Sequence, residues 1–344
     1  MTASTASADG PVFVAGGSGF VGLALCEALL EAGVAVTSYD LAPPPREATD
    51  LFARLPGAFD AVWGDVRDGG ALLQAMARSG APRVASLAAL TAGPERERAT
   101  PRAIFEVNVG GALAVAEAAA ACGAARVVHL SSGSVYGASG RTADVLDENA
   151  TPLAPEGLYE ISKQAAEAAV LRFGALRGLD IRVGRLGTCF GRWERATGAR
   201  DTPSAPFQIL AQALRGEEIV LPRPHPRDWL YARDAAAAIR ALLDASNPPR
   251  RVYNLGAGHV WPLTALCERL GAARPNLRWR LAKAGEPGTV ALYAPYDRAS
   301  MAIGRLRADT GFTPGFDLDA ALADWLAFSD ANLALVSAPW ESAP

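Results

Sequence analysis

The stretch VFVAGGSGFVG, residues 12–22, decides the fold of this 344-residue chain. A short apolar run leads into Gly16, Gly19 and Gly22 in the spacing G-x-x-G-x-x-G, and an Ala/Leu-rich helical pattern follows. Glycines permit a tight turn and a close approach of the backbone to a pyrophosphate, and the N-terminus of the next helix offers free N–H groups and a positive dipole end. Because the motif lies between an expected strand and an expected helix, it predicts a dinucleotide-binding turn.

The first half of the chain repeats this alternation of short β-branched runs and longer helical stretches. The pattern predicts an α/β fold with a Rossmann-type, doubly wound parallel sheet covered by helices on both faces. The Arg-, Pro- and Gly-rich segment Gly191–Pro226 interrupts the alternation and is expected to be irregular. We predict an NAD-binding Rossmann domain over 9–187, to which 228–258 return, and a smaller C-terminal substrate-binding lobe over 188–227 and 259–335.

Three expected strands end in residues suited to the cofactor. Asp40 ends the second, about 20 residues beyond the glycine turn, where a carboxylate accepts hydrogen bonds from ribose hydroxyls and repels a 2′-phosphate. This predicts NAD rather than NADP. Asp65 and Val66 follow the third strand and are expected near the adenine, and Ala88 follows the fourth, near the phosphates and the nicotinamide ribose.

A tyrosine and a lysine four residues apart, Tyr159 and Lys163, are expected on one face of a helix. A nearby ammonium favours the phenolate form of a phenol whose pKa is ordinarily about 10, so Tyr159 is predicted to act as a general base. Ser132 ends the fifth expected strand and is predicted to hold the substrate oxygen while Tyr159 removes its proton.

This ordered set resembles the extended short-chain dehydrogenases/reductases of the NAD-dependent epimerase/dehydratase family. The resemblance runs from about Pro11 to Trp325 and includes Val135-Tyr136-Gly137, Arg227-Asp228-Trp229 and Tyr253-Asn254-Leu255-Gly256. It implies that Ser132, Tyr159 and Lys163 are catalytic, that NAD is the cofactor, and that a homodimer forms through Pro101–Cys122 and Gly157–Leu176. The residues expected at the cofactor are Gly16, Gly19, Phe20, Val21, Gly22, Asp40, Asp65, Val66, Ala88, Asn108, Tyr159 and Lys163.

The residues after Ser132 limit which reaction type of the family is expected. Relatives that eliminate water carry an Asp-Glu pair there, whereas this chain has Gly133-Ser134, so a dehydratase is not expected. A first interpretation is an epimerase that oxidises a hydroxyl of a sugar or nucleotide sugar and returns the hydride to the other face. It is favoured because Arg227 matches a position that grips a diphosphate in such relatives. The residues expected at the substrate are Ser132, Ser134, Arg192, Arg200 and Arg227.

Two alternatives remain open. The first is a dehydrogenase or reductase of a small sugar, sugar acid or hydroxy acid, because Glu286 occupies the place where sugar-nucleotide relatives have a second arginine. The second is a non-catalytic NAD-binding module, which the joint presence of Ser132, Tyr159 and Lys163 disfavours.

Composition excludes other classes of function. A net charge of −3 offers no basic excess for nucleic acid. No apolar run is expected to reach the roughly 20 residues that span a bilayer, and the first ten residues lack the pattern of a secretory signal. Scattered cysteines and histidines predict neither a metal site nor disulfides. We therefore expect a cytoplasmic protein whose partner is a small sugar-like molecule, with no nucleic-acid or membrane partner.

Overall fold

The centre of the molecule is a seven-stranded sheet in which every neighbouring pair is parallel. The computed structural model describes residues 10–337, and in it the strands follow the order β11-β7-β5-β4-β1-β2-β3. The strand order reverses between β1 and β4, which is where ligands of such sheets bind. The predicted fold class is confirmed. The strands are β1 (Val12–Ala15), β2 (Val36–Asp40), β3 (Phe59–Trp63), β4 (Arg83–Ser86), β5 (Arg126–Ser132), β7 (Asp180–Leu186) and β11 (Val252–Leu255).

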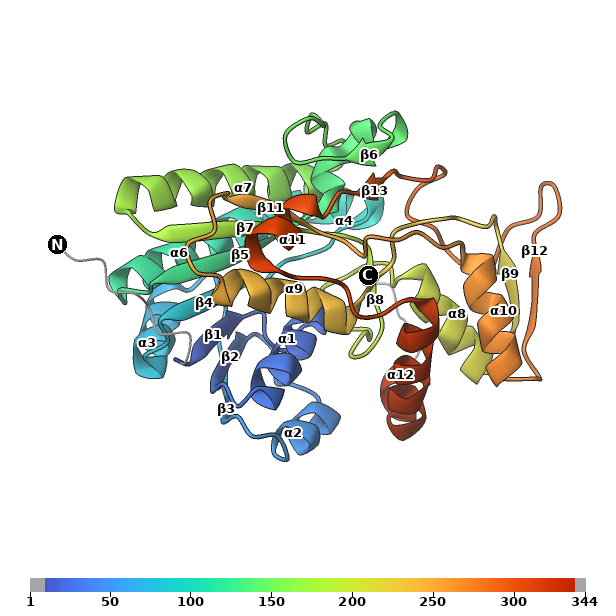
Figure 1. The fold of residues 1–344 in the computed structure, drawn as a ribbon, viewed down its shortest axis with the longest axis horizontal. Coiled ribbons are helices and arrows are strands. Elements are labelled where there is room, and N and C mark those ends of the chain that lie inside the picture. The colour runs from blue at the N-terminus through green and yellow to red at the C-terminus, as the bar shows by residue number, and fades with distance from the viewer. Residues whose placement is uncertain (1–9, 338–344) are drawn as a thin grey trace.

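Helices cover both faces of the sheet (Figure 1). On one side lie α1 (Phe20–Glu31) and α9 (Ala232–Asp244), and on the other lie α3 (Gly69–Ser79), α6 (Ala112–Ala121) and α7 (Leu158–Arg177). Successive side chains of a strand point to opposite faces. Val12 and Val14 therefore belong to the first core, and Phe13 and Ala15 to the second.

The helix expected over Pro101–Cys122 is divided in three. It begins as α5 (Pro101–Phe105), widens into the π-helical segment η1 (Glu106–Gly111), and continues as α6. Contrary to the sequence-based expectation, the span Pro101–Ala121 is long and apolar enough to cross a membrane, by length and composition only. In the structure it packs against α3 and α7 as a helix that covers the sheet.

A second group of elements lies at one end of the sheet (Figure 1). Its core includes the buried indoles of Trp229, Trp261 and Trp325. The prediction of an irregular Gly191–Pro226 segment is wrong in part, because a helix and a strand form inside it. The elements are α8 (Ala205–Leu214), β9 (Glu218–Leu221), α10 (Leu263–Ala273), β12 (Arg278–Leu281), α12 (Leu318–Ala331) and α13 (Leu333–Ser337).

Short elements complete the described chain. Three two-stranded pairs, β10-β8, β12-β9 and β13-β6, are all parallel. The remaining elements are α2 (Arg46–Phe52), α4 (Pro94–Ala99), the 3₁₀ segment η2 (Gly133–Arg141), β6 (Val145–Leu146), β8 (Cys189–Phe190), β10 (Leu230–Tyr231), β13 (Ser300–Met301) and α11 (Gly304–Thr310). The prediction that no signal peptide is present concerns the first ten residues, of which 1–9 lie outside the described residues.

Candidate active site

The glycine turn after β1 has the geometry that the sequence predicts. Gly16 has a φ of +87°, and its N–H donates to the carbonyl oxygen of Tyr39 at 2.8 Å. A Cβ at Gly16 would lie 2.6 Å from the backbone nitrogen of Ala88, and one at Gly22 would lie 2.1 Å from the carbonyl oxygen of Gly16. Only glycine fits at these two positions. The turn leads directly into α1, whose first residues are Phe20 and Val21, so it fits a pyrophosphate at a helix N-terminus.

Asp40, at the end of β2, is fixed against this turn. Its Oδ2 accepts a hydrogen bond from the N–H of Ser18 at 3.0 Å. Burial raises the pKa of Asp40, while backbone N–H groups, led by that of Ser18, and the charge of Arg195 act in the opposite direction. Arg195 donates to the carbonyl oxygen of Ser18 at 2.7 Å. This arginine comes from the loop after β8, and no sequence motif places it beside the glycine turn.

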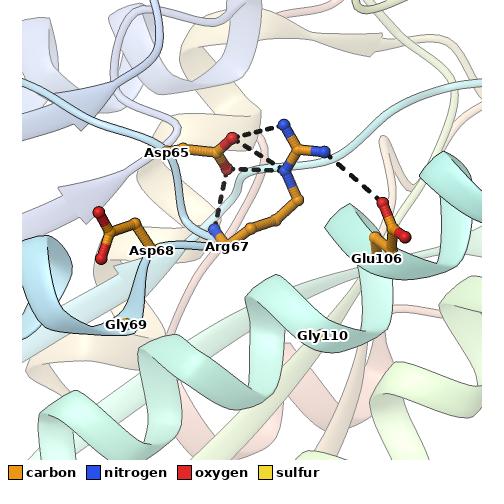
Figure 2. Close-up of a pocket in the computed structure, with 6 residues that line it drawn as sticks. All are labelled: Asp65, Arg67, Asp68, Gly69, Glu106 and Gly110. Carbon is orange, nitrogen blue, oxygen red and sulfur yellow. Dashed lines mark hydrogen bonds and ion pairs between the residues drawn. The ribbon is translucent and has the colours of Figure 1, made fainter.

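Asp65 lies beside an open surface pocket between the loop after β3 and η1 (Figure 2). Its carboxylate accepts hydrogen bonds from the backbone N–H of Arg67 at 2.8 Å and from that guanidinium. This pairing holds the pKa of Asp65 below its usual value. Arg67 also reaches Glu106 at 3.6 Å. Val66 is buried and packs against Gly111, whose added Cβ would lie 2.7 Å from a Val66 methyl.

The two expected catalytic hydroxyls meet at the end of β5. The phenol of Tyr159 lies close enough to the side chains of Ser132 and Thr91 for both hydroxyls to act on its pKa. Ser132 Oγ also accepts from the backbone N–H of Ser134 at 3.1 Å and from its hydroxyl at 2.9 Å. Thr91 was missed by sequence reasoning. Thr91 forms an isolated parallel β-bridge with Arg200. Its position in the site therefore depends on a residue that is far away in the sequence.

Burial raises the pKa of Tyr159, and the hydroxyls of Ser132 and Thr91 and the charge of Arg200 oppose this rise. The expectation that neighbouring positive charge lowers the pKa is therefore not met in the chain alone, because desolvation of the phenolate outweighs the favourable contacts.

Lys163 lies on the same helix face, one turn beyond Tyr159. The residue is 3% exposed, and its ammonium donates to the carbonyl oxygen of Leu130 at 2.6 Å. Burial lowers the pKa of Lys163 to about 8, against the opposing charge of Glu167. Glu167 is itself held by Arg185, 2.5 Å away, so the lysine stands next to a buried ion pair.

Asn108 is fully buried within η1, and its side-chain amide hydrogen-bonds with other residues of the protein. Its amide oxygen accepts from the N–H of Leu90 at 2.8 Å, and its amide nitrogen donates to the carbonyl oxygen of Leu90 at 3.0 Å and to Ser162 Oγ at 2.9 Å. The residue was predicted to contact the cofactor. In the structure it ties the loop after β4 to the helix that carries Tyr159 and Lys163, and its contact with the cofactor stays a prediction.

Of the arginines expected at the substrate, Arg200 lies near the hydroxyl cluster. Arg200 is bonded to Glu194 at 2.9 Å and to the hydroxyl of Tyr293 at 3.0 Å, and its charge acts on Tyr159. Arg227 is 7% exposed and donates to Thr188 Oγ1 at 3.0 Å.

Arg192 is placed elsewhere, because its guanidinium is shared between Glu27 of α1 at 2.8 Å and Asp324 of α12 at 2.7 Å. Both contacts are with buried or half-buried carboxylates, so this side chain joins α1 and α12. Glu286 is likewise paired, with Arg280 at 2.6 Å. The carboxylate whose position suggested a small substrate is therefore neutralised by a neighbouring arginine.

Within residues 10–337, no group of three or more His, Cys, Asp or Glu residues could hold a metal ion. The four cysteines, Cys26, Cys122, Cys189 and Cys267, form no disulfide.

The glycine turn, the strand-end acid and the Ser/Tyr/Lys arrangement at the reversal of a parallel sheet define a Rossmann-type dinucleotide-dependent oxidoreductase. The model of the NAD dependent epimerase/dehydratase family matches residues 12–256, and the chain belongs to that family. It is an NAD-dependent enzyme.

Known proteins of the family resemble the chain along most of its length. The dTDP-glucose 4,6-dehydratase of Xanthomonas campestris pv. campestris is 26% identical over 338 residues, which cover 91% of this chain and 92% of the relative. The UDP-glucuronate 4-epimerase 6 of Arabidopsis thaliana is 27% identical and covers 90% of this chain and 69% of its own length. The structure of MoeE5 in complex with UDP-glucuronic acid and NAD covers 94% of this chain and all of its own, with 24% identity and a TM-score of 0.75.

Proposed function

We propose that the protein is an epimerase of a nucleotide sugar, which oxidises one ring hydroxyl and returns the hydride to the opposite face of the same carbon. The observation that supports this most is the closeness of the Tyr159 phenol to Ser132 at the end of β5. A substrate hydroxyl placed between these two groups can be held by Ser132 while Tyr159 takes its proton. NAD, when bound, supplies the hydride acceptor.

The residues around this pair have separable roles in the proposal. Gly16, Gly22 and Asp40 form the cradle for the dinucleotide, Lys163 holds a positive charge beneath Tyr159, and Asn108 positions the helix that carries both. Arg227 and Arg200 bind the diphosphate side of the substrate, for which arginine forks are suited. Elimination of water is not part of the proposal, because Gly133 follows Ser132 and brings no acid to the site.

We also propose a homodimer formed by α5–η1–α6 and α7 together with their copies in a partner. Half-buried apolar side chains lie on these helices, among them Val109, Leu113 and Phe173. A second copy would cover such side chains at a face that is partly apolar. Free cysteines within the described chain are consistent with a reducing, cytoplasmic location, which we propose as well. The division into an NAD-binding domain (9–187 with 228–258) and a substrate-binding lobe (188–227 and 259–335) remains part of the same proposal.

Thermal unfolding in the presence of NAD tests the proposal first. Ligands that bind the folded state raise the melting temperature by mass action. We expect UDP or another nucleoside diphosphate to raise it, and simple sugar acids such as gluconate to leave it unchanged. A turnover assay then separates the two enzymatic interpretations, since an epimerase accumulates no NADH. Steady NADH accumulation on a single substrate would instead identify a dehydrogenase.

A further inference from the structure

A second arginine, Arg298, lies beside Arg227 in the interior of the protein. Its side chain is 10% exposed and donates to Oδ1 of Asp228 at 3.2 Å. Asp228 is completely buried, and its other oxygen accepts from the N–H of Met301 at 2.9 Å. Burial lowers the pKa of Arg227 to about 10, and the positive charge of Arg298 is the next largest cause. The two guanidinium groups are therefore close enough to repel each other.

Charge at this place is not balanced within the described residues. The buried Arg227 and the half-buried Arg298 have one carboxylate close to both, Asp228, which is paired with Arg298, and the Nε atoms of both arginines have no hydrogen-bond partner among the described residues. Two other carboxylates have their own partners. Asp297 pairs with Arg223 and His225, and Glu148 pairs with Arg305. Buried charges are ordinarily paired, so an anionic group of a ligand would balance the charge at this place.

The guanidinium of Arg298 lies next to the residue that follows Ser132. A Cβ at Gly133 would be 2.7 Å from an Nη atom of Arg298, and one at Gly140 would be 2.7 Å from its Cγ. Glycine at both positions leaves the space that the arginine occupies. The positive charge thus stands one residue away from the hydroxyl that holds the reacting oxygen in the proposed function.

We propose that Arg298 is a specificity-determining residue that binds a carboxylate carried by the sugar ring being oxidised, so that the substrate is a nucleotide-linked sugar acid. This inference rests on the proposed function, which assigns the diphosphate to Arg227. A group that reaches Arg298 while the reacting oxygen lies on Ser132 belongs to the same ring or to its immediate substituent. Among sugar substituents, a carboxylate matches the flat fork of a guanidinium with two parallel hydrogen bonds.

The test measures binding to the NAD-loaded protein by titration calorimetry, in a Tyr159→Phe background that prevents turnover. UDP-glucuronate, UDP-glucose and UDP are compared, because the first two differ only in the carboxylate. We expect UDP-glucuronate to bind at least 10-fold more tightly than UDP-glucose. Arg298→Gln is expected to weaken UDP-glucuronate by about 30-fold or more, the usual cost of removing one partner of a buried charge pair, and to weaken UDP-glucose much less.

Two further variants keep the result interpretable. Arg298→Lys retains the charge and is expected to recover part of the preference, and Arg280→Gln, an exposed arginine paired with Glu286, is expected to leave it unchanged. Equal binding of the two sugars by the protein with Arg298 intact, or an equal loss for both in Arg298→Gln, overturns the inference. Failure of UDP to bind at all overturns the proposed nucleotide-sugar function instead, and free glucuronate against glucose then tests Arg298 alone.

Discussion

Arg195 donates a hydrogen bond from its guanidinium to the carbonyl oxygen of Ser18, at 2.7 Å, and so joins the loop after β8 to the glycine turn after β1. The N–H of the same serine donates to Asp40. A cation from a distant loop therefore stands beside the acid that is predicted to select NAD. Burial lowers the pKa of Arg195, and the charges of Asp40 and Glu47 oppose this effect.

Replacing that acid should change the choice of cofactor. Asp40→Asn keeps an oxygen that can accept from Ser18 but removes the negative charge, and Arg195 remains to attract a 2′-phosphate. We expect the ratio of NAD to NADP affinity to fall by about 10-fold or more, which corresponds to about 1.4 kcal/mol. The double variant Asp40→Asn/Arg195→Gln, titrated in the same way, should lose the gained NADP affinity. An unchanged ratio in the single variant would show that Asp40 does not face the ribose.

Tyr159→Phe should remove proton transfer while leaving the cofactor cradle intact. A positioned general base contributes about 100- to 10,000-fold in rate, so we expect turnover to fall by at least 100-fold and NAD affinity to change little. Steady-state kinetics and NAD titration check the two halves separately. Retained turnover would exclude Tyr159 as the base.

The buried ammonium of Lys163 makes stability depend on pH. Its pKa is about 8 in the folded protein against an ordinary value of 10.5, so between these values the unfolded chain binds more protons and stability rises with pH. The cost of holding the charge, up to about 3 kcal/mol, is fully present below pH 8 and is relieved as the pH rises towards 10.5. We expect the free energy of unfolding of the natural protein, relative to that of Lys163→Met, to increase over this window. Denaturant unfolding at pH 7 to 10 measures it, and parallel curves would contradict the assigned burial.

Two glycines of the turn should differ in their tolerance of alanine. A Cβ at Gly22 would meet the carbonyl oxygen of Gly16 at 2.1 Å, whereas one at Gly19 would approach the same oxygen only to 3.3 Å. Gly22→Ala is expected to destabilise the fold by roughly 1–3 kcal/mol, as overpacking does, and to abolish NAD binding. Gly69→Ala, whose Cβ would meet nothing within 4 Å, is the matched control. Normal NAD binding by Gly22→Ala would remove the turn from the cofactor site.

The proposed dimer can be tested by its mass. Ala165→Arg places a charge on α7 at a half-buried position of the proposed face. We expect light scattering to give about twice 35.7 kDa for the natural chain and a single mass for the variant. Leu73→Arg, on the outer side of α3 and 38% exposed, should leave the assembly unchanged. A natural chain of single mass would contradict the proposal.

The sheet and the glycine turn were predictable because each follows from a pattern of residues that are close together in the sequence. The run Val12–Ala15, the glycines after it and the spacing of Tyr159 from Lys163 all reflect local geometry, and the structure has each as expected. The sequence also contains a local signal for the start of helix α8, although this helix was not predicted. Ser204 caps it by accepting from the N–H of Phe207 at 3.1 Å, with a proline in the first turn.

The remainder depends on contacts between segments far apart in the chain. Thr91, Arg195 and Arg298 carry no motif, and each is placed by a partner from another segment. The π-helical turn at Glu106–Gly111 interrupts an apolar pattern that reads as one continuous helix, and only the tertiary bonds of Asn108 reveal its use. Charge alone suggested Arg192 as a substrate ligand, although its carboxylates lie in helices at both ends of the chain.

The ion pairs of Arg192 limit how this enzyme can be truncated or recombined with a relative. Arg192 bridges Glu27 near the beginning of the chain and Asp324 near its end, and Glu27 also accepts from the indole of Trp193 at 2.6 Å. Removing α12 would leave the largely buried Arg192 with Glu27 as its only remaining carboxylate partner of the two. Because one arginine joins α1 to α12, a graft or truncation has to keep both helices together or replace all three charges at once.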